Sequence, residues 1–196
     1  MQPLIDHARS FRKQSAARSE EFARLAQGQS PQALFITCSD SRVVPALITG
    51  ARPGELFELR TAGNIVPPYA SGHPTGEAAT IEYAVEVLGV ADVVVCGHSH
   101  CGAVGALVRG DDLTSVPAVR DWLTQAAPRP DGTQDDPAVA QAVQNHVLAQ
   151  ILRMRSYPAV ARRLEDGRLR LHAWYYEVHT GTVLAHDPDA DTFTAL

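Results

Sequence analysis

The feature that most constrains the fold of this chain is a nearly uninterrupted apolar run over residues 90–96. Such a run is typical of a strand that is covered on both faces in a parallel sheet. Two shorter β-prone runs, residues 33–37 and 55–60, precede it, and each of the three runs opens into a polar loop. Because the carboxyl ends of parallel strands meet at one edge of a sheet, we expect the three loops to converge. The pattern predicts an α/β fold with a central, mostly parallel β-sheet flanked by helices.

Apolar residues recur at helical spacing in three segments: residues 6–27, 75–88 and 138–154. The first segment is expected to form one amphipathic helix that stops at Gly28. The second is expected to begin at Thr75, which is a good N-cap residue, and to stop at Gly89. Helices therefore alternate with the predicted strands.

The remaining segments are less regular. Residues 111–137 are rich in Pro, Asp and Gln and are interpreted as loop or short helix, while the alternating stretch 169–176 predicts a further strand followed by a turn at Gly181. No repeat or linker interrupts the chain, and its length suits one domain. We therefore predict a single domain over residues 1–196, in which residues 1–28 form an N-terminal helical arm.

Charge restricts the class of partner. The net charge of -5 argues against a nucleic-acid binder and gives no support for binding to anionic membranes, so a small-molecule substrate is expected. Charged residues occur throughout positions 1–30, and no apolar stretch has the length of a signal peptide or a membrane span. The sequence therefore predicts a cytoplasmic protein.

Three residues of the polar loops form a candidate zinc site: Cys38, His98 and Cys101. Thiolate and imidazole are ligands that zinc prefers, and a catalytic zinc commonly keeps three protein ligands and one open position. One close pair plus one distant ligand differs from the two close pairs of a zinc finger. The alternative interpretation is that each is simply a buried residue, as is expected for Cys96 in its apolar strand. His100 is either a proton shuttle or a histidine at the solvent-facing rim.

Two motifs together resemble the paired signature of the β-carbonic anhydrases: CSDSR at residues 38–42 and GHSHCG at residues 97–102. The resemblance runs from residue 28 to about residue 107. It includes the segments PGELF (53–57), RTAGN (60–64) and ATIEYA (79–84), and later in the chain only HAWYY (172–176) is similar.

The resemblance implies the zinc ligands Cys38, His98 and Cys101, one zinc ion per subunit, and a catalytic pair formed by Asp40 and Arg42. It implies reversible hydration of carbon dioxide to bicarbonate and a proton by attack of zinc-bound hydroxide. Asp40 would orient the hydroxide, and Arg42 would keep Asp40 ionised and aside from the metal. Because two thiolates already neutralise the ion, activity is expected to rise toward alkaline pH.

The resemblance further implies a narrow apolar substrate pocket with Phe57, Ala62 and Tyr83, a polar contact from Gln29 to bicarbonate, and a backbone N–H from Gly102. The active site would be built across a homodimer or homotetramer, with Tyr83 reaching in from the neighbouring subunit and the N-terminal helical arm packing on it.

Regulation divides the family into members that are always open and members in which the aspartate can bind zinc when bicarbonate occupies a nearby site. Gln29 and Phe35 favour the open type, whereas Arg60 and Tyr176 match the bicarbonate site of the closing type. The sequence favours the open type.

Two other functions stay open. The same scaffold supports hydrolysis of CS2 or COS, and a non-catalytic bicarbonate-binding or structural zinc protein would carry the same ligands. An alcohol dehydrogenase, which can also use two cysteines and one histidine, is disfavoured because the chain lacks the glycine-rich fingerprint of a dinucleotide site.

Overall fold

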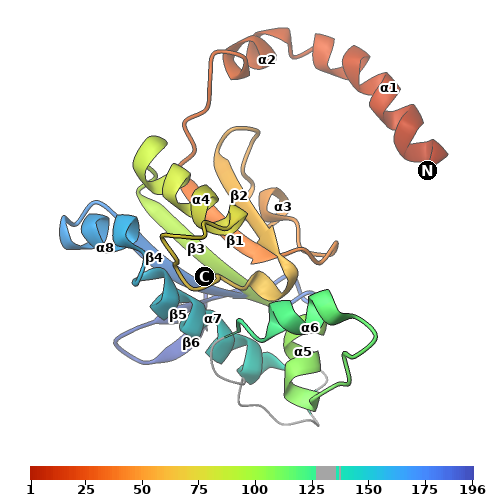
Figure 1. Cartoon of the computed structure of the whole chain (residues 1–196). Helices are drawn as coiled ribbons and strands as arrows, with labels where there is room; N and C mark the ends of the chain where they lie inside the picture. The colour runs from red at the N-terminus through yellow and green to blue at the C-terminus, as the bar shows by residue number, and fades with distance from the viewer. Residues whose placement is uncertain (127–135, 137) are drawn as a thin grey trace.

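A computed structural model gives the structure of the chain and describes residues 1–126, 136 and 138–196 (Figure 1). The strands are β1 (Ala33–Cys38), β2 (Leu56–Thr61), β3 (Asp92–His98), β4 (Arg170–Tyr176), β5 (Val183–Asp187) and β6 (Thr192–Ala195). They form one sheet in the order β2-β1-β3-β4-β5-β6, in which the first four strands are parallel and the last two antiparallel. The predicted α/β fold with a mostly parallel central sheet is confirmed.

The helices are α1 (Gln2–Ala16), α2 (Ser19–Leu25), α3 (Pro45–Thr49), α4 (Gly76–Glu82), α5 (Gly102–Arg109), α6 (Pro117–Leu123), α7 (Ala140–Met154) and α8 (Pro158–Glu165). A short 3₁₀ turn, η1 (Ala62–Asn64), follows β2, and a π-helical turn over Tyr83–Val87 continues α4. The side chain of Thr75 accepts a hydrogen bond from the Ala78 N–H at 3.1 Å, which confirms it as the N-cap of α4. No helix in the described ranges is long and apolar enough to cross a membrane.

Strand β3 lies two residues further along than the predicted span of 90–96. The N–H of Val90 donates to the carbonyl of Ala84 at 3.1 Å and so still belongs to the end of the preceding helix. Gly89, at φ +68°, makes that turn possible because a residue without Cβ adopts this backbone conformation freely. The apolar run therefore contains both a helix terminus and most of a strand.

The prediction of one helix over residues 6–27 is wrong, because α1 and α2 are separate helices. Arg18 adopts a non-helical conformation (φ −120°, ψ 31°) and donates through Nε to Glu21 in the first turn of α2 at 2.7 Å. The rings of Phe11 and Phe22 then meet edge to face, 5.9 Å apart. Both helices extend away from the sheet (Figure 1), and neither contains a buried residue.

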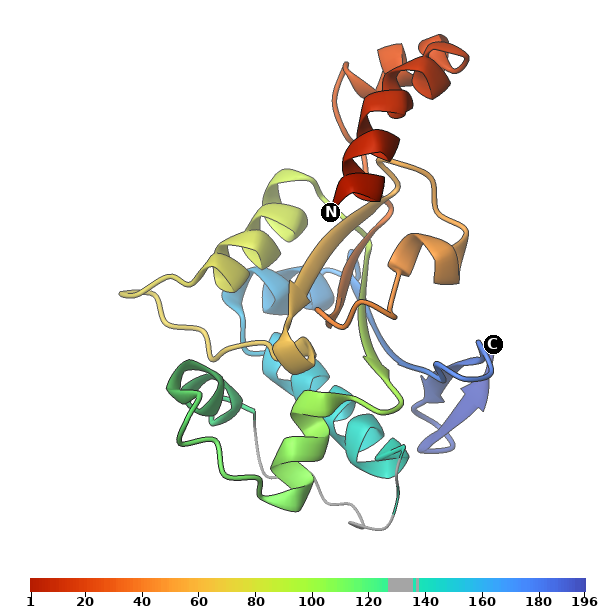
Figure 2. The same cartoon turned by 90° about the vertical axis from the view of Figure 1, so that its right-hand side faces the viewer.

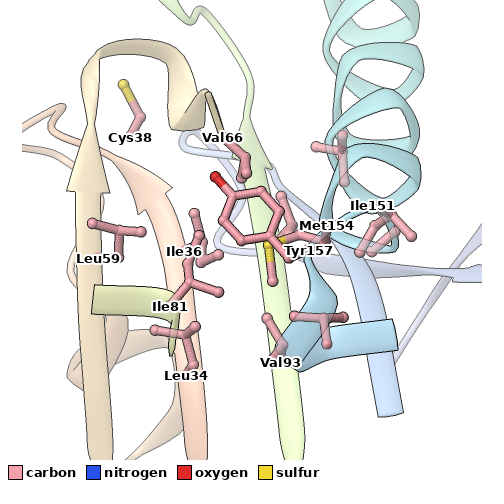
Figure 3. Close-up of a cluster of buried hydrophobic side chains, with 14 of the residues drawn as sticks. Leu34, Ile36, Cys38, Leu59, Val66, Ile81, Val93, Ile151, Met154 and Tyr157 are labelled. Carbon is pink, nitrogen blue, oxygen red and sulfur yellow. The ribbon is translucent and has the colours of Figure 1, made fainter. Parts of the chain in front are cut away.

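The main core lies on the face of the sheet that α4, α7 and α8 cover (Figure 2). Figure 3 shows Leu34 and Ile36 of β1 pointing into it, together with Val93 of β3 and the side chains of Met154 and Tyr157. The opposite face carries a smaller buried cluster of Phe35, Val94 and Cys96, with Trp174 packed against it. Because successive side chains of a strand point to opposite faces, the single residue step from Leu34 to Phe35 separates the two clusters.

Candidate metal centre

Three residues from the carboxyl edge of the sheet form the centre. Cys38 is the last residue of β1, His98 is the last residue of β3, and Cys101 is the N-cap of α5. Their ligand atoms lie within 4.8 Å of one another, and the three residues are 7%, 0% and 2% exposed. The sheet thus brings together the three residues that the sequence proposed as ligands.

The histidine is oriented for metal binding. Nδ1 of His98 lies 2.9 Å from the carbonyl oxygen of Ser99, so this nitrogen carries the proton and donates it. Nε2 is then an acceptor, and it is buried without a hydrogen-bond partner among the described residues. A buried lone pair with no partner is costly unless a metal or proton takes it. The neutral imidazole and two thiols fit Zn²⁺, which prefers this donor set.

The two thiols influence each other's ionisation. A hydrogen bond from Cys101 lowers the pKa of Cys38 to about 4, and because Cys101 is the donor in that bond its own pKa is raised. The N–H of Gly63 also donates to Sγ of Cys38 at 3.3 Å. A lowered pKa favours the thiolate, which is the form of cysteine that binds a metal ion, and metal binding would release the proton of the second thiol.

The Asp40–Arg42 pair lies beside the three ligands. Arg42 donates from Nε to one carboxylate oxygen of Asp40 at 2.9 Å and from its terminal nitrogen to the other at 2.7 Å, and its backbone N–H donates at 2.9 Å. These bonds hold the pKa of Asp40 well below its usual range. The carboxylate lies 3.9 Å from Nε2 of His98. Asp40 is thus ionised, close to the ligands and directed onto Arg42.

Arg60 holds the loop that carries this pair. It donates to the backbone carbonyls of Cys38 at 2.9 Å, of Asp40 at 2.8 Å and of Val43 at 2.8 Å. A guanidinium can bind several carbonyls at once because its donors form a rigid fork. The sequence resemblance associates Arg60 only with a bicarbonate site and does not indicate this use of its donors.

The turn η1 forms the floor of the centre. Gly63 has φ +73°, and a Cβ there would lie 2.9 Å from Cβ of Ala103. Nε2 of His146, on α7, lies 2.8 Å from the carbonyl oxygen of Gly63, and Gln150 one turn later accepts the N–H of Val66 at 3.0 Å. Neither His146 nor Gln150 was among the residues predicted from the sequence. Two polar residues four positions apart on an otherwise apolar helix face were the available signal.

The residues expected in the substrate pocket divide between two edges of the sheet. Ala62 lies in η1 and Gly102 begins α5, so both are at the carboxyl edge with the ligands. Gln29 precedes β1, and Phe57 pairs with Leu34 near the start of that strand. Strand β1 rises about 3.3 Å per residue, or roughly 16 Å from Ala33 to Cys38.

Tyr83 belongs with the distant residues. Its ring lies 5.9 Å from that of Phe57, and it is 44% exposed. Gln29, Phe57 and Tyr83 thus lie at the amino edge, and the fold does not bring them to the metal centre of their own chain. His100, the other candidate, is exposed at the rim, with its ring 6.3 Å from that of His179.

A mostly parallel sheet with two thiols and an imidazole clustered at its carboxyl edge defines an α/β protein whose ligand cluster could hold a metal ion in an open-site pattern. Residues 33–183 match a family model described as carbonic anhydrase. A carbonic anhydrase of Pseudomonas aeruginosa is 47% identical over 100% of this chain and 92% of its own length. A carbonic anhydrase of Synechococcus elongatus is 44% identical over 94% of this chain and 71% of its own length.

Solved structures agree with these relatives. The β-carbonic anhydrase CcaA superposes with a TM-score of 0.92 at 40% identity, covering 100% of this chain and 99% of that chain. A Coccomyxa β-carbonic anhydrase in complex with acetazolamide superposes with a TM-score of 0.78 at 29% identity, covering 92% of this chain and 83% of that chain. The chain belongs to the β-carbonic anhydrase family and is an enzyme of that class.

Proposed function

We propose that this enzyme catalyses the reversible hydration of carbon dioxide to bicarbonate and a proton, with Zn²⁺ held by Cys38, His98 and Cys101. The observation that carries the proposal is the ionised Asp40, held by Arg42 with its carboxylate 3.9 Å from a ligand nitrogen. When bound, the zinc supplies a Lewis acid that lowers the pKa of water enough to give a nucleophile near neutral pH.

The residues of the chain supply orientation. An ionised carboxylate can only accept hydrogen bonds. Asp40 can therefore accept a hydrogen bond from the attacking oxygen, which leaves a lone pair of that oxygen directed at the carbon of CO2. Arg42 occupies both carboxylate oxygens and also donates to the carbonyl of His100 at 3.1 Å, which fixes the pair to the ligand loop. A structural zinc protein has no need of an ionised carboxylate held beside its ligands.

Stopped-flow CO2 hydration by the wild type and by Asp40→Ala tests the proposal. We expect the wild type to exceed the buffer rate by orders of magnitude and the variant to fall about 10²-fold while it retains one zinc per chain. A zinc-loaded wild type no faster than buffer contradicts the proposal and favours a non-catalytic zinc protein. The same instrument with COS or CS2 as substrate tests the sulfur-analogue reaction.

We also infer that the complete substrate pocket needs a second copy of the chain. Gln29, Phe57 and Tyr83 lie a strand's length from the metal centre of their own subunit, so they can contribute only to a partner's centre. The helical arm, which buries no residue in its own chain and exposes Leu4 and Phe11, is the natural element to hold that partner. A homodimer, or a homotetramer built from dimers, is the expected state.

Mixed oligomers provide the test. Gln29→Ala and Asp40→Asn should each be slow when pure. After unfolding and refolding of a 1:1 mixture, half of the dimers pair one of each, and one of their two sites combines an intact Gln29 with an intact Asp40. We expect recovery of about a quarter of the wild-type rate. A mixture no faster than the pure variants places Gln29 outside the partner's site.

We propose the open regulatory type for this chain. Support comes from the intact bonds of Arg42 to Asp40 and from Arg60, whose donors bind three backbone carbonyls of the catalytic loop. Phe35 offers no hydrogen-bond donor toward an anion. Steady-state rates at pH 7 with and without added bicarbonate, corrected for product inhibition, should show no cooperative loss of activity. A sigmoidal loss, or a crystal at low pH with Asp40 bound to zinc, contradicts this assignment.

A further inference from the structure

One peptide unit of η1 is hydrogen-bonded at both ends. Its N–H, that of Gly63, donates to Sγ of Cys38 at 3.3 Å. Its carbonyl, that of Ala62, accepts the indole N–H of Trp122 at 2.8 Å. A side chain sixty residues away in sequence is therefore linked through a single amide to a proposed zinc ligand.

Trp122 reaches this peptide from outside the ligand loops. It lies half-buried on α6, where the neighbouring Leu123 is 2% exposed and anchors the helix to the body. His146 binds the next carbonyl of the turn, that of Gly63, which belongs to a different peptide unit. The amide whose N–H donates to the Cys38 sulfur therefore accepts, at its carbonyl, a hydrogen bond from the indole of Trp122 and not from His146.

The physical effect of such a chain is directional. A hydrogen bond accepted by an amide carbonyl polarises the amide and strengthens its N–H as a donor, by roughly 10–30% per bond. A stronger N–H bond to a thiolate withdraws negative charge from the sulfur, and contacts of this kind around the ligands tune a bound metal.

We propose that Trp122 is a positioning residue for the metal centre: through the Ala62–Gly63 peptide it fixes the N–H donor to Cys38 and lowers the electron donation of that thiolate to the metal. The inference rests on the proposed zinc site, but not on the proposed catalytic activity. It assigns a role to α6, which lies in the segment that the sequence left as loop or short helix.

Absorption of the cobalt-substituted protein tests the proposal, because the thiolate-to-cobalt charge-transfer band reports the electron density on sulfur directly. Trp122→Phe keeps a ring in place and removes the N–H. We expect the band to move to longer wavelength by several nanometres, since a more electron-rich sulfur is easier to ionise. Arg120→Gln, which removes an exposed ion pair with Asp121 on the same helix, is the matched control and should leave the band in place.

A second replacement guards against misfolding of the phenylalanine variant. Site-specific incorporation of benzothienylalanine at position 122 exchanges only the indole N–H for sulfur and keeps the shape of the side chain. It should give the same shift at an unchanged thermal midpoint. An unmoved band in this protein, or an equal shift in Arg120→Gln, overturns the proposal and reduces Trp122 to a packing residue.

Failure of the proposed function gives a different result. A wild type that shows the thiolate-to-cobalt band but hydrates no CO2 refutes the activity, and the band shift still decides the role of Trp122. A wild type that shows no such band lacks the thiolate site, which overturns the role of Trp122 as well.

Discussion

The two edges of the parallel sheet differ in how many of their loops and side chains are held by contacts within one chain. At the carboxyl edge, the ligand loops are held by side chains of the same chain: Arg60 on the carbonyls of the loop after β1, His146 and Trp122 on those of η1. At the amino edge, Tyr83 is 44% exposed and the arm buries nothing. The metal centre is therefore held by side chains of its own subunit, whereas the proposed pocket around it needs residues of a second subunit.

The largest expected effect comes from replacing one of the proposed metal ligands at the carboxyl edge. His98→Gln removes an imidazole that is fully buried and whose Nε2 has no partner among the described residues. We expect loss of bound zinc and a fall in CO2 hydration of at least about 10³-fold, because the metal supplies the nucleophile. Metal analysis together with stopped-flow rates measures both effects.

Cys96→Ala is the matched control for that experiment. Cys96 lies two residues before His98 in β3 but is not part of the three-residue ligand cluster, and it is buried against Phe35 and Val94, where burial raises the pKa of its thiol to about 12. The variant should keep one zinc per chain. Loss of zinc from the control, or retention of zinc by His98→Gln, contradicts the assignment of the ligands.

The amino edge is tested by removal of the arm. A chain that begins at Gln29 keeps every described contact of the metal centre, because neither α1 nor α2 contains a buried residue. We expect it to sediment as a monomer, to retain zinc, and to lose activity by one to two orders of magnitude, about 10–10². A monomer with full activity would contradict the proposal that the amino-edge residues act only in the site of a partner subunit.

A smaller effect is expected from the floor of the centre. Gly63→Ala places a Cβ 2.9 Å from that of Ala103 at a residue with φ +73°. The strained backbone should cost about 1–3 kcal/mol in the free energy of unfolding and weaken zinc binding, since the N–H donor to Cys38 shifts. Chemical denaturation and competition with a chelator measure the two effects.

Gly181→Ala is the control for that substitution. Gly181 also has positive φ, at +77°, but it has open space around it and lies in the turn after β4. It should lose stability without any change in zinc affinity. If both variants weaken zinc binding equally, the effect of Gly63→Ala is a general loss of stability and not a property of the floor.

The smallest effect is a pH dependence of stability from the Asp40–Arg42 pair. The pKa of Asp40 is lowered in the folded state, chiefly by hydrogen bonds from Arg42, so its contribution is fully present above the unfolded value near pH 4 and is lost as the pH falls below it. Arg42 is 47% exposed, so solvent screening limits the contribution to about 1 kcal/mol or less.

Thermal unfolding of wild type and Arg42→Gln measures this dependence. The difference in midpoint should be larger at pH 6 than at pH 3. A difference that grows toward low pH would contradict the sign of the shift. Arg170→Gln is a useful comparison at the amino edge, because its bidentate bond to Asp92 lowers the pKa of that carboxyl in the same way, far from the ligands.

Much of the carboxyl edge could be predicted because the sequence patterns that indicate its residues lie within short segments. Cys38 and the His98–Cys101 pair each follow an apolar β-prone run, and parallel strands bring such positions to one edge whatever the details of packing. Asp40 and Arg42 lie two residues apart in one short loop, so two residues of opposite charge are already close in sequence. The helix boundary at Arg18 was not predicted, because helical spacing of apolar residues does not reveal that the rings of Phe11 and Phe22 meet across a break.

Short segments of the sequence were therefore enough to predict the α/β class, the three proposed ligands and the proposed catalytic pair, since strand periodicity and donor chemistry are local properties. Only the fold shows which side chains hold those segments, because Arg60, Trp122 and His146 bind backbone carbonyls that lie 17 to 83 residues away in sequence, and the sequence pattern does not say which carbonyls they reach. The fold also decided that Gln29, Phe57 and Tyr83 lie at the edge away from their own metal centre. Strand direction and length fix that separation, and no motif records it.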